Sequence, residues 1–220
     1  MTIKATSLPY MAAVEGLATG ALLIAVVGSG IMAERLCGGN IGLALLANAI
    51  GTGCALFVLI LTCGAQMNPI VTLAAATIGE LSWREVPVRM AAQFAGGILG
   101  VWLTHIMFAQ PVWQFSHHMR SGSGQWVAES VATFGLLAVV GGCRKHGEPV
   151  TAIAVAAYIT GAYWFTASTS FANPAVTFAR AFSDSFAGIR PADVPAFAAA
   201  QLAGMALALP ILSRQKRAEA

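Results

Sequence analysis

Two short segments of the chain contain residues that could bind a solute. The segments "NPIVT" at 68–72 and "NPAVT" at 173–177 each place an asparagine directly before a proline. Proline suits the first turn of a helix and asparagine is a good N-cap, so each pair predicts the start of a helix. The asparagine amide can also donate hydrogen bonds to a neutral oxygen that passes it. The candidate residues are therefore Asn68, Pro69 and Ile70 in the first segment, and Asn173, Pro174 and Ala175 in the second.

The composition indicates the surroundings of these two segments. Of the 220 residues, 57% are hydrophobic and 10% are charged, whereas a soluble domain carries about 25% charged residues. This scarcity of charge places the chain among the integral membrane proteins, with the lipid bilayer as its environment. The formal net charge of +3 is too small to indicate a nucleic-acid partner.

Six nearly uncharged segments are long enough to cross a bilayer as helices, since a crossing takes about 20 residues. The Asn-Pro segments, at 68–78 and 173–182, are shorter and cover only about half of a ~30 Å apolar core. We therefore expect two half-helices that begin near the membrane centre. Irregular backbone at that depth is tolerated where it lines a cavity or is buried in protein, which indicates a water-filled path. The predicted spans are 11–33, 41–63, 86–108, 126–144, 149–170 and 194–213.

The two halves of the chain repeat each other. Three landmarks occur twice in the same order: "VEGLAT" with "AESVAT", "NPIVT" with "NPAVT", and "AAQFAG" with "AAQLAG". Each half holds three spans, an odd number, so the second half must lie inverted in the membrane relative to the first. We predict one channel domain over 1–220, with repeats at about 8–108 and about 122–213.

Inversion brings the N-termini of the two half-helices together. Each N-terminus carries about +0.5 of an elementary charge, so two facing ends repel cations, hydronium included. Together with the two asparagine amides, this arrangement favours small, uncharged, polar solutes.

The basic residues predict how the chain is oriented. With the N-terminus in the cytoplasm, eight basic residues lie inside and four outside, as the positive-inside rule requires. The inner set is Lys4, Arg84, Arg89, Arg144, Lys145, Arg214, Lys216 and Arg217, and the outer set is Arg35, Arg120, Arg180 and Arg190.

The paired NPxVT motifs, a glutamate in the first and fourth spans, and Gln-x-x-Gly in the third and sixth resemble the aquaporin and aquaglyceroporin family over essentially the whole chain. More narrowly, "NPAVTFARAFSDSFAGIRPADVPAF" is similar to aquaporin-like channels of bacterial arsenic-resistance operons. The resemblance implies an all-α membrane fold with six transmembrane helices and two re-entrant half-helices. It also implies one pore per subunit, a homotetramer in the bacterial inner membrane with both termini cytoplasmic, and no cofactor. Glu15 and Glu129 would brace the re-entrant loops by accepting backbone N–H bonds; a proton relay is the alternative.

The chain departs from this family at the outer selectivity filter. Val176 stands where the family carries arginine, directly after the second Asn-Pro-Ala. By offset from that motif, the neighbouring filter positions are Ser170 and Gly161. The fourth position is Asn48 or Thr52, one helix turn apart, depending on how a shortened loop before the first motif is aligned. Without the usual arginine and histidine and without a bulky aromatic residue, this ring predicts a wide filter.

Arg180 has two interpretations. It follows Val176 by four residues, so it lies on the same helix face, about 5.4 Å further outward. It could line the outer mouth and partly replace the missing arginine, or extend to the membrane interface.

The remaining polar residues suggest no catalytic or metal site. Gln66 stands where the family has histidine before the first motif. We interpret His105, His117 and His118 as solvated at the outer side. Cys37, Cys54, Cys63 and Cys143 have no metal-ligand spacing, and we interpret them as small buried apolar residues.

These patterns predict a passive channel for small neutral solutes, with arsenite, glycerol, urea, ammonia and water as candidates. An ion-coupled secondary transporter shares the inverted repeats and intramembrane glutamates, and is one alternative. A mainly water-permeable channel is another. An enzyme is not indicated, because the sequence lacks a nucleophile–base pair, a metal cluster or a phosphate loop.

Overall fold

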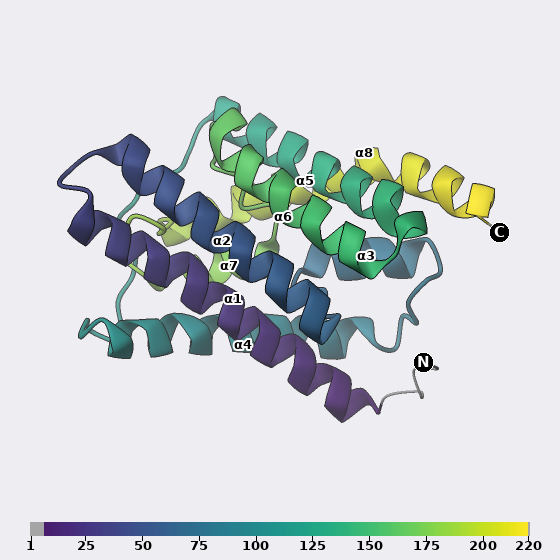
Figure 1. Ribbon diagram of the computed structural model, residues 1–220, viewed down its shortest axis with the longest axis horizontal. Helices are drawn as coiled ribbons and strands as arrows, with labels where there is room; N and C mark the ends of the chain where they lie inside the picture. Colours follow the sequence, from purple (N-terminus) through teal and green to yellow (C-terminus); the bar gives the residue numbers. More distant parts are fainter. Residues whose placement is uncertain (1–6, 220) are drawn as a thin grey trace.

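The computed structural model describes residues 7–219, and over that range the regular structure is entirely helical (Figure 1). This confirms the all-α prediction. The elements are α1 (Leu8–Leu36), α2 (Ile41–Cys63), α3 (Pro69–Thr77), α4 (Val86–Met107), α5 (Ser123–Cys143), η1 (Arg144–His146), α6 (Glu148–Phe165), α7 (Pro174–Arg180), η2 (Pro191–Asp193) and α8 (Val194–Glu219).

Among the described residues, five helices are long and apolar enough to cross a membrane. They correspond to α1, α2, α4, α5 with η1, and α8 with η2. The sixth predicted span, 149–170, was placed too far toward its C-terminus, because α6 ends at Phe165 and has 18 residues. Thr166 is already extended, and Thr169, Ser170 and Ala172 have positive φ. The C-terminal part of this apolar run therefore forms the loop that leads into the second half-helix.

The long helices pack in corresponding pairs, α1 with α4 and α5 with α8. Glycines allow both contacts. A Cβ atom on Gly96 would collide with the backbone of Gly16, and one on Gly204 would collide with the carbonyl oxygen of Ser130. Close approach of backbones through small residues is the usual way in which membrane helices associate.

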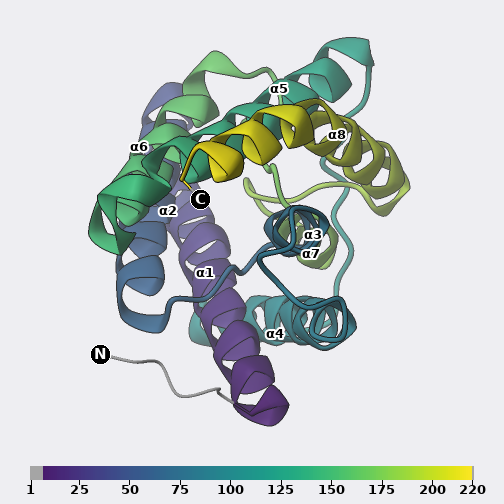
Figure 2. The ribbon, with the colours of Figure 1, turned by 90° about the vertical axis from the view of Figure 1, so that its right-hand side faces the viewer.

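The half-helices α3 and α7 lie at the centre of the bundle, with the longer helices around them (Figure 2). They meet at their N-terminal ends. Asn68 Nδ2 donates to the carbonyl oxygen of Ala172 at 2.8 Å, and Asn173 Nδ2 donates to that of Met67 at 2.7 Å. These reciprocal bonds join the two repeats at the point where both half-helices begin.

Candidate pore

Each asparagine of the Asn-Pro motifs caps its own half-helix. Asn68 Oδ1 accepts the N–H of Ile70 at 2.9 Å, and Asn173 Oδ1 accepts the N–H groups of Ala175 and Val176 at 3.0 and 3.2 Å. An amide nitrogen carries two hydrogens, and the bond to the opposite loop uses one of them. The geometry therefore leaves each asparagine a second hydrogen with which to bind a ligand.

Two glutamates hold the loops that precede the half-helices. Glu15 accepts the backbone N–H groups of Gln66 at 3.0 Å and Met67 at 2.8 Å. Glu129 accepts those of Phe171 and Ala172, both at 2.8 Å. Both loops carry residues with positive φ, so their N–H groups point away from any regular helix partner. Carboxylates on α1 and α5 satisfy these donors inside the bundle.

The bracing extends into a matched side-chain network. Gln93 Nε2 donates to Glu15 at 2.9 Å and to Thr72 Oγ1 at 3.1 Å. In the second repeat, Gln201 Nε2 donates to Glu129 at 2.7 Å and to Thr177 Oγ1 at 2.9 Å. The same three residue types, Glu, Gln and Thr, thus link a long helix, its partner helix and a half-helix in both repeats.

The two networks differ in charge. Glu15 also accepts a salt bridge from Arg89 at 2.8 Å. Within the described residues, no salt bridge reaches Glu129, whose side chain is fully buried. Glu129 is therefore stabilised by its three hydrogen bonds, which must stay intact.

A cavity of about 160 Å³ runs past the junction of the half-helices. Its lining reaches from Thr151, near the start of α6, to Tyr163, near the end of that helix. Twelve helical residues correspond to about 18 Å, so the cavity follows much of the length of the bundle. Most of the wall is apolar; the polar lining residues are Thr52, Gln66, Asn68, Thr151, Tyr163, Ser170, Asn173 and Arg180.

A family profile described as Major intrinsic protein matches residues 3–165. The chain belongs to the major intrinsic protein family. It is similar to "Aquaglyceroporin AqpS" of Rhizobium meliloti (strain 1021), with 49% identity over 90% of this chain and 86% of that protein. The "Glycerol uptake facilitator protein" of Bacillus subtilis (strain 168) is 29% identical over 47% of this chain and 40% of that protein.

A solved structure supports the same fold. The aquaglyceroporin from Plasmodium falciparum aligns with a TM-score of 0.66 at 19% sequence identity, covering 94% of this chain and 95% of that chain. These similarities confirm the family and the fold class expected from the sequence. As a major intrinsic protein, the chain is a membrane channel for small neutral solutes.

The structure places the expected filter residues of this major intrinsic protein in different surroundings. Val176, Ser170 and Thr52 line the cavity. Asn48 lies outside that lining, because its Nδ2 donates to Val26 O and to Ser29 Oγ on α1, each at 2.8 Å. Of the two alternatives for the second-helix position, the structure therefore favours Thr52.

Gly161 also lies outside the lining, and Tyr163 lines the cavity instead. The Tyr163 hydroxyl on α6 lies 3.1 Å from Thr52 Oγ1 on α2, and both residues line the cavity. Phe171 lines the same region. The cavity wall therefore carries two aromatic residues, Tyr163 and Phe171, beside the positions expected for the filter. Gly161 and Tyr163 are two residues apart, so their side-chain directions differ by about 200° around α6. The position of Gly161 was counted back from Asn173 through an irregular loop, and that count led to the opposite face of the helix.

Arg180 is buried, with 2% of its surface exposed, and lines the cavity. Its Nε donates to the carbonyl oxygen of Ala187, and its guanidinium carbon lies 3.4 Å from the centre of the Phe171 ring. This burial rules out the interpretation in which Arg180 extends to the membrane interface. The major intrinsic protein thus has a guanidinium in the wall of the cavity, one helix turn beyond Val176.

The histidines lie apart from the cavity. His105 is buried, not solvated as expected, because its ring nitrogens lie 3.1 Å from Val112 O and from Ser183 Oγ. His117 is exposed and pairs with Asp184 at 2.9 Å. The backbone N–H of His117, and then its side chain, lower the pKa of the Asp184 carboxyl.

The cysteines also differ from their expected placement. All four are free thiols, and none of them is buried; Cys54 and Cys63 are exposed on α2. A thiol is a weakly polar group, so it is compatible with an apolar outer surface. Within residues 7–219, the side chains form no cluster that could hold a metal ion.

Proposed function

We propose that this channel passes small neutral solutes larger than water, with glycerol and undissociated arsenite as the solutes to test first. The relatives in the comparison include an aquaglyceroporin and a glycerol uptake facilitator, which supports this class of solute. Arsenite, As(OH)₃, resembles glycerol in being neutral and carrying several hydroxyls, so it needs no charge compensation in the pore.

The observation that carries the proposal is the chemistry of the cavity wall. One part is a row of donors and acceptors that includes Asn68, Asn173 and Ser170, and most of the rest is aliphatic. The Ser170 hydroxyl is buried and has no hydrogen-bond partner within the described residues. A solute with hydroxyls on one side and C–H groups on the other satisfies both parts of such a wall, whereas water satisfies only the polar part.

We assign the residues as follows. Asn68 and Asn173, with the prolines and the residues Ile70 and Ala175 that follow them, form the central site. Thr52, Tyr163, Ser170, Phe171, Val176 and Arg180 form the outer filter, where steric fit and hydrogen bonding select solutes. Glu15 and Glu129 are structural braces.

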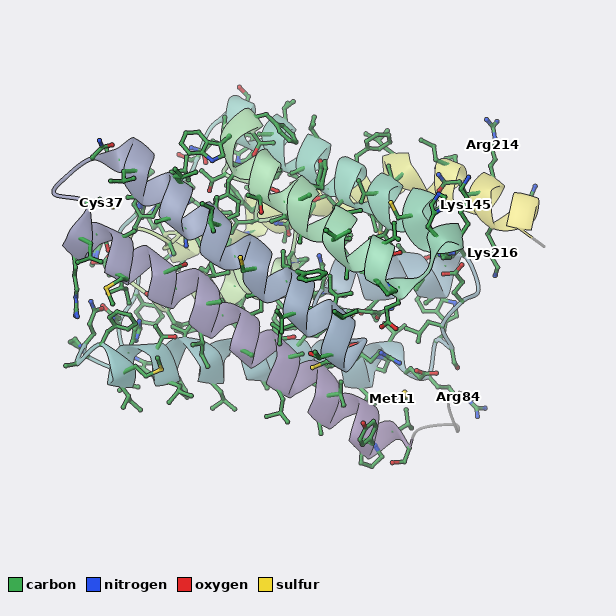
Figure 3. The ribbon with its side chains drawn as sticks, viewed as in Figure 1. Met11, Cys37, Arg84, Lys145, Arg214 and Lys216 are labelled. Carbon is green, nitrogen blue, oxygen red and sulfur yellow. The ribbon has the colours of Figure 1, made fainter. Side chains whose placement is uncertain are left out.

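The proposed orientation places both termini on the cytoplasmic side of a bacterial inner membrane. Arg84, Lys145, Arg214 and Lys216 gather at the end of the bundle where α1 begins and α8 ends (Figure 3). Cys37 lies at the opposite end. Lys4, also expected inside, lies outside the described residues. This distribution agrees with the positive-inside rule, and the family resemblance suggests a homotetramer of four separate pores.

Reconstituted vesicles test the solute class. Stopped-flow light scattering should show water, glycerol, urea and arsenite entering faster than in protein-free vesicles. Ser170→Ala should lower glycerol flux relative to water flux, because it removes the unpaired hydroxyl and little else. Acceleration of water alone would favour the water-channel alternative. Uphill accumulation of solute that collapses with a protonophore would favour a coupled transporter.

A further inference from the structure

Arg120 lies in the outer loop between α4 and α5 and fastens three other loop segments. Its backbone N–H donates to Asp193 Oδ2 at 2.8 Å, and its Nε donates to the carbonyl oxygen of Gly188 at 2.8 Å. Its terminal nitrogens lie 3.3 to 3.4 Å from three further acceptors, which are the carbonyl oxygens of Ser168 and Phe186 and the hydroxyl of Thr169. The side chain is buried and lies outside the cavity lining.

The same guanidinium contacts an aromatic wall of the cavity. Its central carbon lies 4.9 Å from the centre of the Phe171 ring, and that of Arg180 lies 3.4 Å from the same centre. The backbone of Phe171 is held by Glu129, and its ring packs edge-to-face on Phe197 at 5.3 Å. Glu129 thus fixes the backbone of Phe171, and the ring of Phe171 contacts two guanidinium groups, Arg120 in the outer loop and Arg180 in the cavity.

Two buried cations on one ring constrain each other. Burial, and then the nearby charge of Arg180, lower the pKa of Arg120 to about 9, so it stays protonated at neutral pH. Like charges repel, and the ring attracts both. Four acceptors in the loops hold the Arg120 guanidinium, whereas the hydrogen bonds of the Arg180 guanidinium within the described residues are limited to one, to the carbonyl oxygen of Ala187. Arg180 is therefore the partner that can adjust, and its reach into the cavity depends on the positions of Arg120 and Phe171.

We propose that Arg120 is a positioning residue: acting through Phe171, it fixes how far Arg180 reaches into the outer end of the pore, and so controls which neutral solutes pass. Arg120 itself touches no solute. This inference rests on the proposed function, because it concerns the selectivity of the same pore.

The test compares Arg120→Gln with Arg190→Gln in reconstituted vesicles. Arg190 is a matched control, since it is a cation in the neighbouring loop that binds the other oxygen of Asp193 at 2.8 Å and, among the described residues, makes no cation–π contact with Phe171. The measured quantity is the ratio of glycerol flux to water flux, which cancels differences in protein yield. Arg120→Gln should raise this ratio by about two- to fivefold, the size expected for a lost cation–π contact. Arg190→Gln should leave it unchanged.

A double variant separates positioning from simple support of the loops. In an Arg180→Ala background, Arg120→Gln should change the flux ratio no further, because the group it positions is gone. An equal change in both backgrounds, or an unchanged ratio in a well-folded Arg120→Gln channel, would overturn the inference.

A third variant covers the case in which Arg120→Gln does not fold. Phe171→Leu removes the ring that links the two arginines, and it also widens the cavity wall directly because Phe171 lines the cavity. It should therefore raise the flux ratio in both backgrounds, and by more in the wild-type background than beside Arg180→Ala. An equal rise in both backgrounds, or a rise in neither, would overturn the inference. Absence of glycerol flux in the wild-type channel would instead refute the proposed function.

Discussion

Replacing Glu129 with alanine would remove the brace of the second re-entrant loop. The carboxylate accepts three hydrogen bonds, from the backbone of Phe171 and Ala172 and from Gln201 Nε2, at 2.7 to 2.8 Å. An unsatisfied buried donor costs roughly 1–3 kcal/mol, so the three together cost roughly 3–9 kcal/mol if none finds a new partner. A folded domain is stable by only about 5–15 kcal/mol. We therefore expect Glu129→Ala to yield little folded channel.

Size-exclusion chromatography and thermal unfolding in one detergent measure this effect. Glu129→Gln keeps an acceptor oxygen, so it should lose less folded protein than Glu129→Ala. Glu15→Ala is the matched variant in the other repeat; there Arg89 keeps its second carboxylate partner, Glu85, at 3.0 Å. A Glu129→Ala channel that keeps the wild-type unfolding midpoint would refute the brace. One that folds normally and loses only pH-dependent transport would support a proton relay instead.

Three further substitutions test the pore wall and the packing of the bundle. Val176→Arg should slow glycerol and arsenite much more than water, because it adds a long cation to the cavity wall one helix turn from Arg180. An unchanged ratio of water to glycerol flux in a folded channel would place the constriction elsewhere. Gly96→Val should abolish the yield of folded channel, because the valine side chain would collide with the backbone of Gly16. Gly161→Ala should be tolerated with unchanged solute flux, since the new Cβ atom would meet only the Phe165 ring, at 3.7 Å. A changed ratio of glycerol to water flux in Gly161→Ala would show that Gly161 belongs to the selectivity filter, as the sequence predicted.

The sequence alone was enough to predict the membrane class, the inverted arrangement and the two half-helices. The scarcity of charged residues and the length of the uncharged segments reflect the cost of placing polar groups in lipid. The prediction of a membrane protein therefore needs no tertiary information. Asn-Pro predicts the start of a helix from local preferences alone, because asparagine caps helices and proline suits their first turn. A segment that is too short to span the membrane must then be a half-helix. The bracing role of Glu15 and Glu129 was instead implied by the resemblance to the aquaporin family, and both carboxylates accept the N–H groups of the re-entrant loops.

Tertiary structure decided which side chains reach the pore. Thr52 and Asn48 share a helix face, and only packing against α1 shows that Asn48 is bonded to Val26 and Ser29. Tyr163 replaces Gly161 in the lining because the loop after α6 contains left-handed residues, which break the relation between sequence offset and helix phase. Arg180 is assigned to the pore by its burial and its place in the cavity lining, which depend on the fold. Helix periodicity specifies a face, but the direction that this face points depends on contacts between residues far apart in the chain.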